Sequence, residues 1–242
     1  MEKEIFDRGN LFSRTESLIG VQALGRLAQS RVTVLGLGGV GGMAAEALAR
    51  SGVGEIVVID GDVISETNIN RQVIALHSTI GQAKAQVMCA RILDINPACK
   101  VTAKNQFLTK SDFPVLLSGS DYIVDAIDMV TVKLDLAEYC EREGLQLICS
   151  LGTGNKLDPS RFRIVDIYET KVCPLARVMR RELKKRDVKG LKVLYSDEQP
   201  AKALAEDNPP DTGRHAPASI SFVPPAAGLI IAGQVVRELA GL

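Results

Sequence analysis

The chain alternates between short apolar runs and longer segments in which apolar residues recur at helical spacing. Continuous apolar runs at 31–35, 55–60 and 121–127 predict strands that are buried on both faces, as in a parallel sheet. The segment between the first two runs, 39–51, is rich in Ala and Leu and predicts a helix. Strand, helix and strand in this order form a βαβ unit, whose crossover is right-handed.

The rest of the chain extends this pattern in both directions. Apolar residues at helical spacing predict further helices, and alternating or short apolar runs predict further strands. The predicted helices are 12–19, 21–28, 81–95, 132–143, 174–186 and 226–239, and the predicted strands are 100–104, 145–149, 161–168, 192–195 and 219–223. Residues 196–218 hold many Pro, Asp, Glu and Lys and few apolar residues, which predicts a mobile loop. The sequence thus predicts an α/β fold.

Composition narrows the class of protein. Lys and Arg total 29, as do Asp and Glu, so the net charge is zero and no overall basic excess indicates nucleic acid. Residues 1–8 lack the apolar core of a signal peptide, and no apolar run is long enough to span a bilayer. We therefore predict a cytoplasmic protein without a membrane partner. The five cysteines are odd in number and none is paired as C-x-x-C, which argues against a zinc site.

A glycine-rich turn follows the first predicted strand, with Gly36, Gly38, Gly39 and Gly41 at the start of the predicted helix. Glycines let the backbone approach a phosphate closely, and the helix presents unpaired N–H groups. With Asp60 at the end of the second strand, the turn is compatible with a nicotinamide dehydrogenase, in which the acid holds the ribose hydroxyls. A purely structural turn is the other interpretation.

Three charged residues that follow strands or begin a helix favour a nucleoside triphosphate over a dinucleotide. Arg71, in the motif Asn68-Ile-Asn-Arg-Gln72, offers a planar fork for phosphate oxygens, which hydride transfer does not need. Lys84 lies in the first turn of a predicted helix, where a bound anion would explain a cation. Asp128 ends the third strand, at the edge where ligands bind, and could hold Mg²⁺. Alone, each residue is also compatible with an ordinary turn or a surface charge.

Five motifs occur together in this order over about residues 10–150: the glycine turn, Asp60-Gly-Asp62, Asn68–Gln72, Gly81-Gln-Ala-Lys84 and Asp125-Ala-Ile-Asp128. In this they resemble the ThiF/MoeB/HesA superfamily, the bacterial relatives of ubiquitin-activating enzymes. The resemblance implies that the chain binds ATP and Mg²⁺ and adenylates a carboxylate, with pyrophosphate leaving. It also implies a homodimer.

The resemblance assigns a role to each matching residue. It implies that Asp60 holds the ribose, that Asp128 holds Mg²⁺, and that the phosphates are held by Asn70, Arg71 and Lys84. The remaining implied nucleotide contacts are Gly36, Gly38, Gly39, Gly41, Asp62 and Asn68. The implied catalytic residues are Arg71, Lys84, Asp128 and Arg14, of which Arg14 would reach the triphosphate bound by the other subunit.

The C-terminal half distinguishes the branches of this superfamily. Relatives that act on ubiquitin-like sulfur carriers bind zinc through two C-x-x-C pairs, which this chain lacks. Segments 155–159, 172–183 and 219–228 instead resemble the tRNA threonylcarbamoyladenosine dehydratase branch. This implies ATP-dependent dehydration, a cyclisation, of threonylcarbamoyladenosine at position 37 of tRNA by carboxylate adenylation. Adenylation of a ubiquitin-like sulfur carrier is the alternative, and a nucleotide-bound scaffold without turnover is a third interpretation.

The same resemblance implies a fold and a division of the chain. The fold is a Rossmann-like twisted, mainly parallel sheet flanked by helices and extended by antiparallel C-terminal strands. The chain forms a single ThiF-type adenylation domain over 1–242, with a nucleotide-binding part at 1–150. The remainder, 151–242, faces substrate and tRNA and contains the mobile loop at about 196–218.

A basic segment supports an RNA partner separately. Eight Lys or Arg residues lie between 177 and 192, against Glu182 and Asp187. Such a local patch suits contacts to a phosphate backbone, although a solvated helix face has the same pattern. Cys173, just before a predicted helix, allows a sulfur relay as an alternative to a structural thiol. A cysteine desulfurase or sulfur-acceptor system is therefore a further candidate partner.

Overall fold

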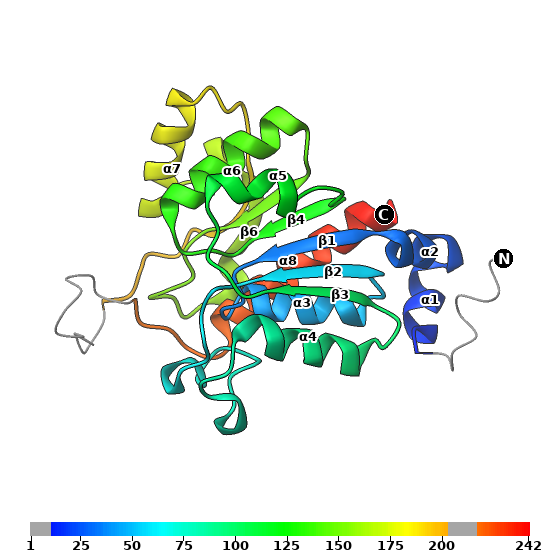
Figure 1. Cartoon of the computed structure of the whole chain (residues 1–242). Coiled ribbons are helices and arrows are strands. Elements are labelled where there is room, and N and C mark those ends of the chain that lie inside the picture. The colour runs from blue at the N-terminus through cyan, green and yellow to red at the C-terminus, as the bar shows by residue number, and fades with distance from the viewer. Residues whose placement is uncertain (1–10, 203–216) are drawn as a thin grey trace.

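One sheet of seven strands forms the centre of the computed structural model, which describes residues 11–202 and 217–242 (Figure 1). The strands lie in the order β3-β2-β1-β4-β5-β7-β6. Their bounds are Arg31–Leu35 (β1), Glu55–Ile59 (β2), Lys100–Lys104 (β3), Tyr122–Asp125 (β4), Leu147–Ser150 (β5), Phe162–Asp166 (β6) and Lys192–Ser196 (β7). Neighbouring strands are parallel except β6 and β7, which are antiparallel. The predicted mainly parallel sheet with an antiparallel C-terminal extension is confirmed.

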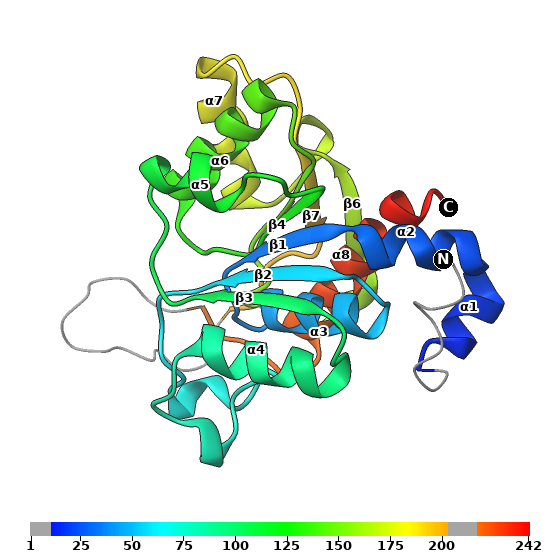
Figure 2. The ribbon, with the colours of Figure 1, turned by 45° about the vertical axis from the view of Figure 1, so that its right-hand side comes forward.

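Helices cover both faces of this sheet, the usual layering around parallel strands (Figures 1 and 2). Helices α3, α4 and α8 lie on one face and α5, α6 and α7 on the other, while α1 and α2 lie beyond the end at which β1 begins. The bounds are Ser13–Ile19 (α1), Val21–Gln29 (α2), Gly41–Arg50 (α3), Lys84–Ile95 (α4), Phe113–Leu116 (α5), Val130–Glu143 (α6), Pro174–Lys185 (α7) and Val223–Ala240 (α8). Within the described residues, none of these helices combines the length and apolar character needed to cross a bilayer.

The strands contribute alternate side chains to two apolar cores. Val32 and Val34 of β1 belong to the core that includes α3, α4 and α8. Leu35, together with Val57 and Ile59 of β2, belongs to the core beneath α5, α6 and α7. This alternation follows from the pleat, which points successive side chains to opposite faces. Residues on both sides of position 150 contribute to each core and to the one sheet.

The start of α8 overturns one predicted strand. The prediction of a strand at 219–223 is wrong, because residues 217–220 form no strand and α8 begins at Val223. Pro224 and Pro225 occupy the first helical turn, where a missing N–H costs no helical hydrogen bond. Gly228 lets α8 approach α3 closely, since an added Cβ would lie 2.3 Å from the carbonyl oxygen of Val40.

Two predicted boundaries shift at the carboxyl edge of the sheet, the edge at which the parallel strands end. Strand β4 ends at Asp125 and not at Ile127, so Asp128 lies in the loop before α6. Helix α4 begins at Lys84 and not at Gly81, because Gly81 has a φ of +82°, outside the right-handed helical region. Both shifts lengthen the loops at this edge.

The predicted mobile loop at 196–218 begins later than its composition suggested. Ser196 is the last residue of β7 and is buried. The Glu198 carboxylate accepts hydrogen bonds from the backbone N–H groups of Leu157 (2.9 Å) and Asp158 (3.1 Å). Residues 203–216 lie outside the described residues, so the loop there stays a prediction.

Candidate functional site

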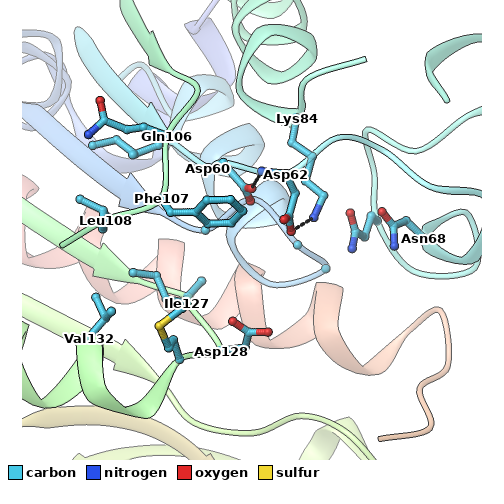
Figure 3. Close-up of a pocket in the computed structure, with 18 of the residues that line it drawn as sticks. Asp60, Asp62, Asn68, Lys84, Gln106, Phe107, Leu108, Ile127, Asp128 and Val132 are labelled. Atoms are coloured by element: carbon cyan, nitrogen blue, oxygen red, sulfur yellow. Dashed lines mark hydrogen bonds and ion pairs between the residues drawn. The ribbon is translucent and has the colours of Figure 1, made fainter. Parts of the chain in front are cut away.

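A cavity of about 550 Å³ opens at the carboxyl edge of the sheet, beside the ends of β1, β2 and β4 (Figure 3). The strand order reverses between β1 and β4, and open α/β sheets bind ligands at such a switch point. The lining residues are Gly36, Gly38, Gly39, Ile59, Asp60, Gly61, Asp62, Asn68, Arg71, Gln72, Lys84, Gln106, Phe107, Leu108, Ala126, Ile127, Asp128, Met129 and Val132. The structure thus brings together nine of the residues predicted for the site: three glycines and six polar or charged residues.

The glycine turn forms one wall, and its glycines serve different purposes. Gly36 has a φ of +81°, and a Cβ there would lie 2.7 Å from the Ala126 carbonyl oxygen. At Gly38 an added Cβ would find no atom closer than 3.8 Å, so backbone is left bare toward the cavity. Gly41 does not line the cavity. A Cβ on Gly41 would lie 1.8 Å from the Gly36 carbonyl oxygen, so this glycine allows α3 to start against the turn.

Asp60 and Asp62 join the turn to the helix that carries Lys84. The Asp60 carboxylate accepts hydrogen bonds from the backbone N–H of Leu37 (2.6 Å) and of Asp62 (2.8 Å). The Asp62 carboxylate is paired with Lys84 Nζ at 2.8 Å (Figure 3). Lys84 is the first residue of α4 and its side chain is only 8% exposed, so Asp62 offsets a cation held against the positive end of the helix dipole.

The segment after β2 holds Arg71 at the cavity and turns Asn70 away from it. Arg71 Nη1 donates to the Thr67 carbonyl oxygen (2.9 Å) and to Asn70 Oδ1 (2.8 Å). Asn70 does not line the cavity, and its amide donates to the Ser219 carbonyl oxygen at 3.1 Å. Asn68 lines the cavity, but its Oδ1 accepts from the Ser65 N–H (3.1 Å) and caps the local turn. Asn70 therefore supports Arg71 in this structure, and its predicted phosphate contact stays a prediction.

A buried ion pair lies beneath the loop that carries Asp128. Lys133 Nζ donates to Asp125 Oδ1 (3.0 Å) and to the Ser150 carbonyl oxygen (2.9 Å), and both charged side chains are 1% exposed. Burial lowers the pKa of Lys133, but the Asp125 carboxylate and the Cys149 sulfur together outweigh it, so the lysine pKa lies above its usual value. Asp125 Oδ1 also accepts from the Ile127 N–H at 3.1 Å. The pair therefore fixes the loop, while the exposed Asp128 forms no hydrogen bond or ion pair with another described residue.

The other end of the cavity is apolar and was not predicted from the sequence (Figure 3). Phe107, after β3, is 65% exposed, and a Cβ on Gly61 would lie 2.7 Å from its ring. The remaining apolar lining comes from Leu108, Ile127, Met129 and Val132. Since β3 is parallel to β2, the loop after it must emerge at the same edge as Asp60, and this was the one available signal for Phe107.

Arg14 and Cys173 do not line this cavity. Arg14 belongs to α1, which lies beyond the opposite end of the sheet (Figures 1 and 2). Cys173 precedes α7 and is packed in the core beneath α5, α6 and α7. Over residues 11–202 and 217–242, no three His, Cys, Asp or Glu side chains are grouped as metal ligands.

The cavity as a whole suits an elongated anion with an apolar part. Lys84 lies at one end and Phe107, Leu108 and Val132 lie at the other (Figure 3). Arg71 lies beside the glycine turn, since a Cβ on Gly39 would lie 3.1 Å from its carbonyl oxygen. Asp60 lies between the two ends in the close-up (Figure 3). Glycine turns and helix N-termini bind phosphate groups, and apolar pockets take flat rings, so a nucleotide matches both ends.

Comparison with known proteins identifies the family of this chain. The ThiF family model matches residues 12–241. The chain belongs to the ThiF family. This ThiF family member is 45% identical over 239 residues to the tRNA threonylcarbamoyladenosine dehydratase of Bacillus subtilis (strain 168), and the match covers 94% of each chain.

The fold comparison agrees with the sequence comparison. The E. coli tRNA N6-threonylcarbamoyladenosine dehydratase TcdA, solved in complex with ATP, superposes with a TM-score of 0.85 and 33% identity, over 95% of this chain and 93% of that chain. The match to an E1 activating enzyme covers a smaller part of the chain. The SAMP-activating enzyme E1 of Haloferax volcanii is 38% identical over 130 residues, 54% of this chain and 48% of that protein. The predicted resemblance to the dehydratase branch of the ThiF family is confirmed.

Proposed function

We propose that this ThiF family member is an ATP-dependent tRNA threonylcarbamoyladenosine dehydratase that works by carboxylate adenylation. The observation that carries the proposal is a single cavity lined by Arg71, Lys84 and the exposed carboxylate of Asp128, with bare backbone at Gly38. The 45% identity to the Bacillus subtilis dehydratase over 94% of both chains supports this choice among adenylating enzymes.

ATP would enter with its base at the apolar end and its phosphates at the charged end. Phe107, Leu108 and Met129 offer the base apolar surface, and Asp60 lies where the ribose would pass (Figure 3). The phosphates would lie along the bare backbone of the glycine turn, within reach of Arg71 and Lys84. Lys84 is already held in place by Asp62 at 2.8 Å, so phosphate meets a cation whose position is set before binding.

The adenylation step follows from this placement. The carboxylate of the threonylcarbamoyl group attacks the α-phosphate, the bond to the β-phosphate oxygen breaks, and pyrophosphate leaves. Arg71 and Lys84 stabilise negative charge on the phosphates during this transfer, which is the main demand that phosphoryl-type chemistry makes of a protein. A neighbouring atom of the same modified base then attacks the activated carbonyl and expels AMP, so the base loses one water overall. No protein nucleophile is needed, because both reacting groups belong to one substrate.

The carboxylate of Asp128 suits a Mg²⁺ ion bound with ATP in the cavity. Asp128 is an exposed carboxylate that lines the cavity and has no hydrogen bond or ion pair to another described residue, and Mg²⁺ prefers carboxylate and phosphate oxygens. Asp128 would hold the ion against the phosphates of ATP. When bound, it would neutralise phosphate charge and orient the leaving pyrophosphate.

We further propose a cytoplasmic homodimer in which the second subunit contributes Arg14. Helix α1 lies far from the cavity of its own chain, beyond the amino ends of the strands, so Arg14 can act only on the cavity of another subunit (Figures 1 and 2). Its guanidinium would add a third cation to the triphosphate. The division into a nucleotide-binding part and a tRNA-facing part within one domain stays a prediction, as does a sulfur-transfer partner.

The product of the reaction tests this function directly. We expect the protein, given ATP, Mg²⁺ and tRNA that carries threonylcarbamoyladenosine, to reduce the mass of that nucleoside by one water and to release AMP and pyrophosphate. Nucleoside mass spectrometry measures the first change. An unchanged nucleoside, with pyrophosphate exchange only when a protein ending in Gly-Gly is supplied, would favour sulfur-carrier activation instead.

A further inference from the structure

The eight basic residues between 177 and 192 are not equivalent in the folded chain. Four of them are committed to local contacts. Arg186 is paired with Asp135 and Glu138, Lys189 with Asp187, and Lys192 with Glu238. Arg180 is half-buried and donates to the carbonyl oxygen and hydroxyl of Thr170. Three of these cations are paired with carboxylates and Arg180 is held at Thr170, so contacts within the chain orient all four side chains.

The other four cations form one exposed face of α7, which we call the α7 cationic face: Arg177, Arg181, Lys184 and Lys185. The opposite face of the helix, Ala176, Met179 and Leu183, is buried in the core. Glu182 is the one carboxylate that faces these cations among the described residues, and it is paired with both Arg181 (2.8 Å) and Lys185 (3.0 Å). The face therefore keeps an excess of positive charge along a helix of about 18 Å.

The placement of α7 connects this face to the site. The first turn of α7 lies against the loop that follows β5, since a Cβ on Gly152 would lie 4.0 Å from Leu175. That loop emerges at the carboxyl edge of the sheet, where the cavity opens. Helix α7 then runs beside α6, whose Val132 lines the cavity (Figure 1). The cationic face thus begins at the edge where a substrate enters and continues away from it.

We infer that the α7 cationic face binds the phosphate backbone of the tRNA while the modified base occupies the cavity, an inference that rests on the proposed function. Four exposed Lys and Arg side chains against one carboxylate leave a net positive charge, and such a row binds a polyanion by releasing its counterions. Helix α7 carries no aromatic residue, so the face offers nothing for bases to stack on and reads the backbone rather than the sequence. Its continuity with the cavity edge favours the nucleic acid that delivers the substrate over an acidic protein or an anionic membrane.

Charge removal on the face gives a direct test. The variant Arg177→Gln/Arg181→Gln/Lys184→Gln removes three cations and keeps good helix formers. Its matched control, Lys100→Gln/Arg142→Gln/Arg237→Gln, removes three exposed cations at the start of β3, the end of α6 and the end of α8. The measurement is the KM for tRNA carrying threonylcarbamoyladenosine at several salt concentrations, together with kcat and the KM for ATP.

We expect the KM for tRNA to rise by about 10- to 100-fold in the α7 variant and the slope of log KM against log salt to fall by about two to three. The kcat at saturating tRNA and the KM for ATP should stay unchanged, and the control should stay within about twofold of the unmodified protein. An unchanged KM and salt slope, or an equal rise in the control, would overturn the inference, as would binding of the face to anionic phospholipid vesicles and not to tRNA. If the unmodified protein does not dehydrate the nucleoside at all, the proposed function fails instead.

Discussion

The charged end and the apolar end of the cavity are built in different ways. At the charged end, Lys84 is held by Asp62 and Arg71 by Asn70 and Thr67, so each cation is positioned before any ligand arrives. At the apolar end, Phe107 is 65% exposed and Met129 49% exposed, and their surroundings are loops. Preorganised charge acts on a transition state, whereas apolar surface binds substrate and transition state equally. Changes at the charged end should therefore act on kcat, and changes at the apolar end on the KM for ATP.

The largest effect on activity is expected from Asp128→Ala, which removes an exposed carboxylate from the cavity lining. We expect kcat/KM to fall about a thousandfold, mostly through kcat, because a group that positions charge in the transition state is lost. The thermal midpoint should not change, since Asp128 is exposed and has no partner among the described residues. Asp94→Ala is the matched control, another exposed carboxylate that lies near the end of α4, away from the cavity. Activity of Asp128→Ala within tenfold of the unmodified protein would remove Asp128 from the site.

A second change tests the buried ion pair of Asp125 and Lys133, which lies beneath the loop that carries Asp128. Lys133→Met leaves the Asp125 carboxylate buried without its cation, and loss of one partner of a buried pair costs about 3 kcal/mol or more. Urea unfolding measures this loss of stability. The double variant Asp125→Asn/Lys133→Met removes the stranded charge while the Asn oxygen can still accept from the Ile127 N–H. It should recover most of the loss, and a double variant no more stable than the single one would contradict a charge-based explanation.

The charged end of the cavity could be predicted from the sequence, whereas the apolar end could not. The parallel strands, the glycine turn and Asp60 could be predicted, because apolar runs fix the strands and these residues stand directly after them. Arg71, Lys84 and Asp128 could be predicted from charged residues in motifs that resemble those of the superfamily. Phe107 and Leu108 lie in a mostly polar stretch after β3, so only the assembled sheet brings them to the cavity.

Two residues assigned to the nucleotide from the sequence, Asn70 and Gly41, lie outside the cavity lining, and their nucleotide contacts stay predictions. Asn70 bonds to Ser219, 149 residues further along the chain, and no local periodicity carries that contact. Gly41 faces the carbonyl oxygen of Gly36, so its lack of a side chain serves the packing of α3. The strand predicted at 219–223 failed for a similar reason: its apolar residues belong to the first turn of α8 and the segment leading into it.

At the apolar end, Phe107→Ala should raise the KM for ATP about tenfold and leave kcat unchanged, because an aromatic surface for the base is lost without a change near the phosphates. Stability should change little, since the ring is mostly exposed. Steady-state kinetics with ATP varied at saturating tRNA measures both parameters. Val115→Ala is the control, an apolar residue on α5 that is 77% exposed and outside the cavity lining. A fall in kcat with an unchanged KM for ATP would show that Phe107 does not act as base-binding surface.

The smallest effect, and the sharpest separation of the two ends, is expected from Met129→Ala. Met129 is the neighbour of Asp128 in the chain, yet its half-exposed side chain belongs to the apolar lining. Loss of that partial contact should raise the KM for ATP by about two- to threefold and leave kcat intact. Asp128 would then act on kcat and its neighbour Met129 on the KM for ATP. This result is expected if the chemistry of each side chain, and not its position in the loop, determines its role. If Met129→Ala instead lowers kcat as Asp128→Ala does, the loop acts as one unit and the two ends of the cavity are not separable.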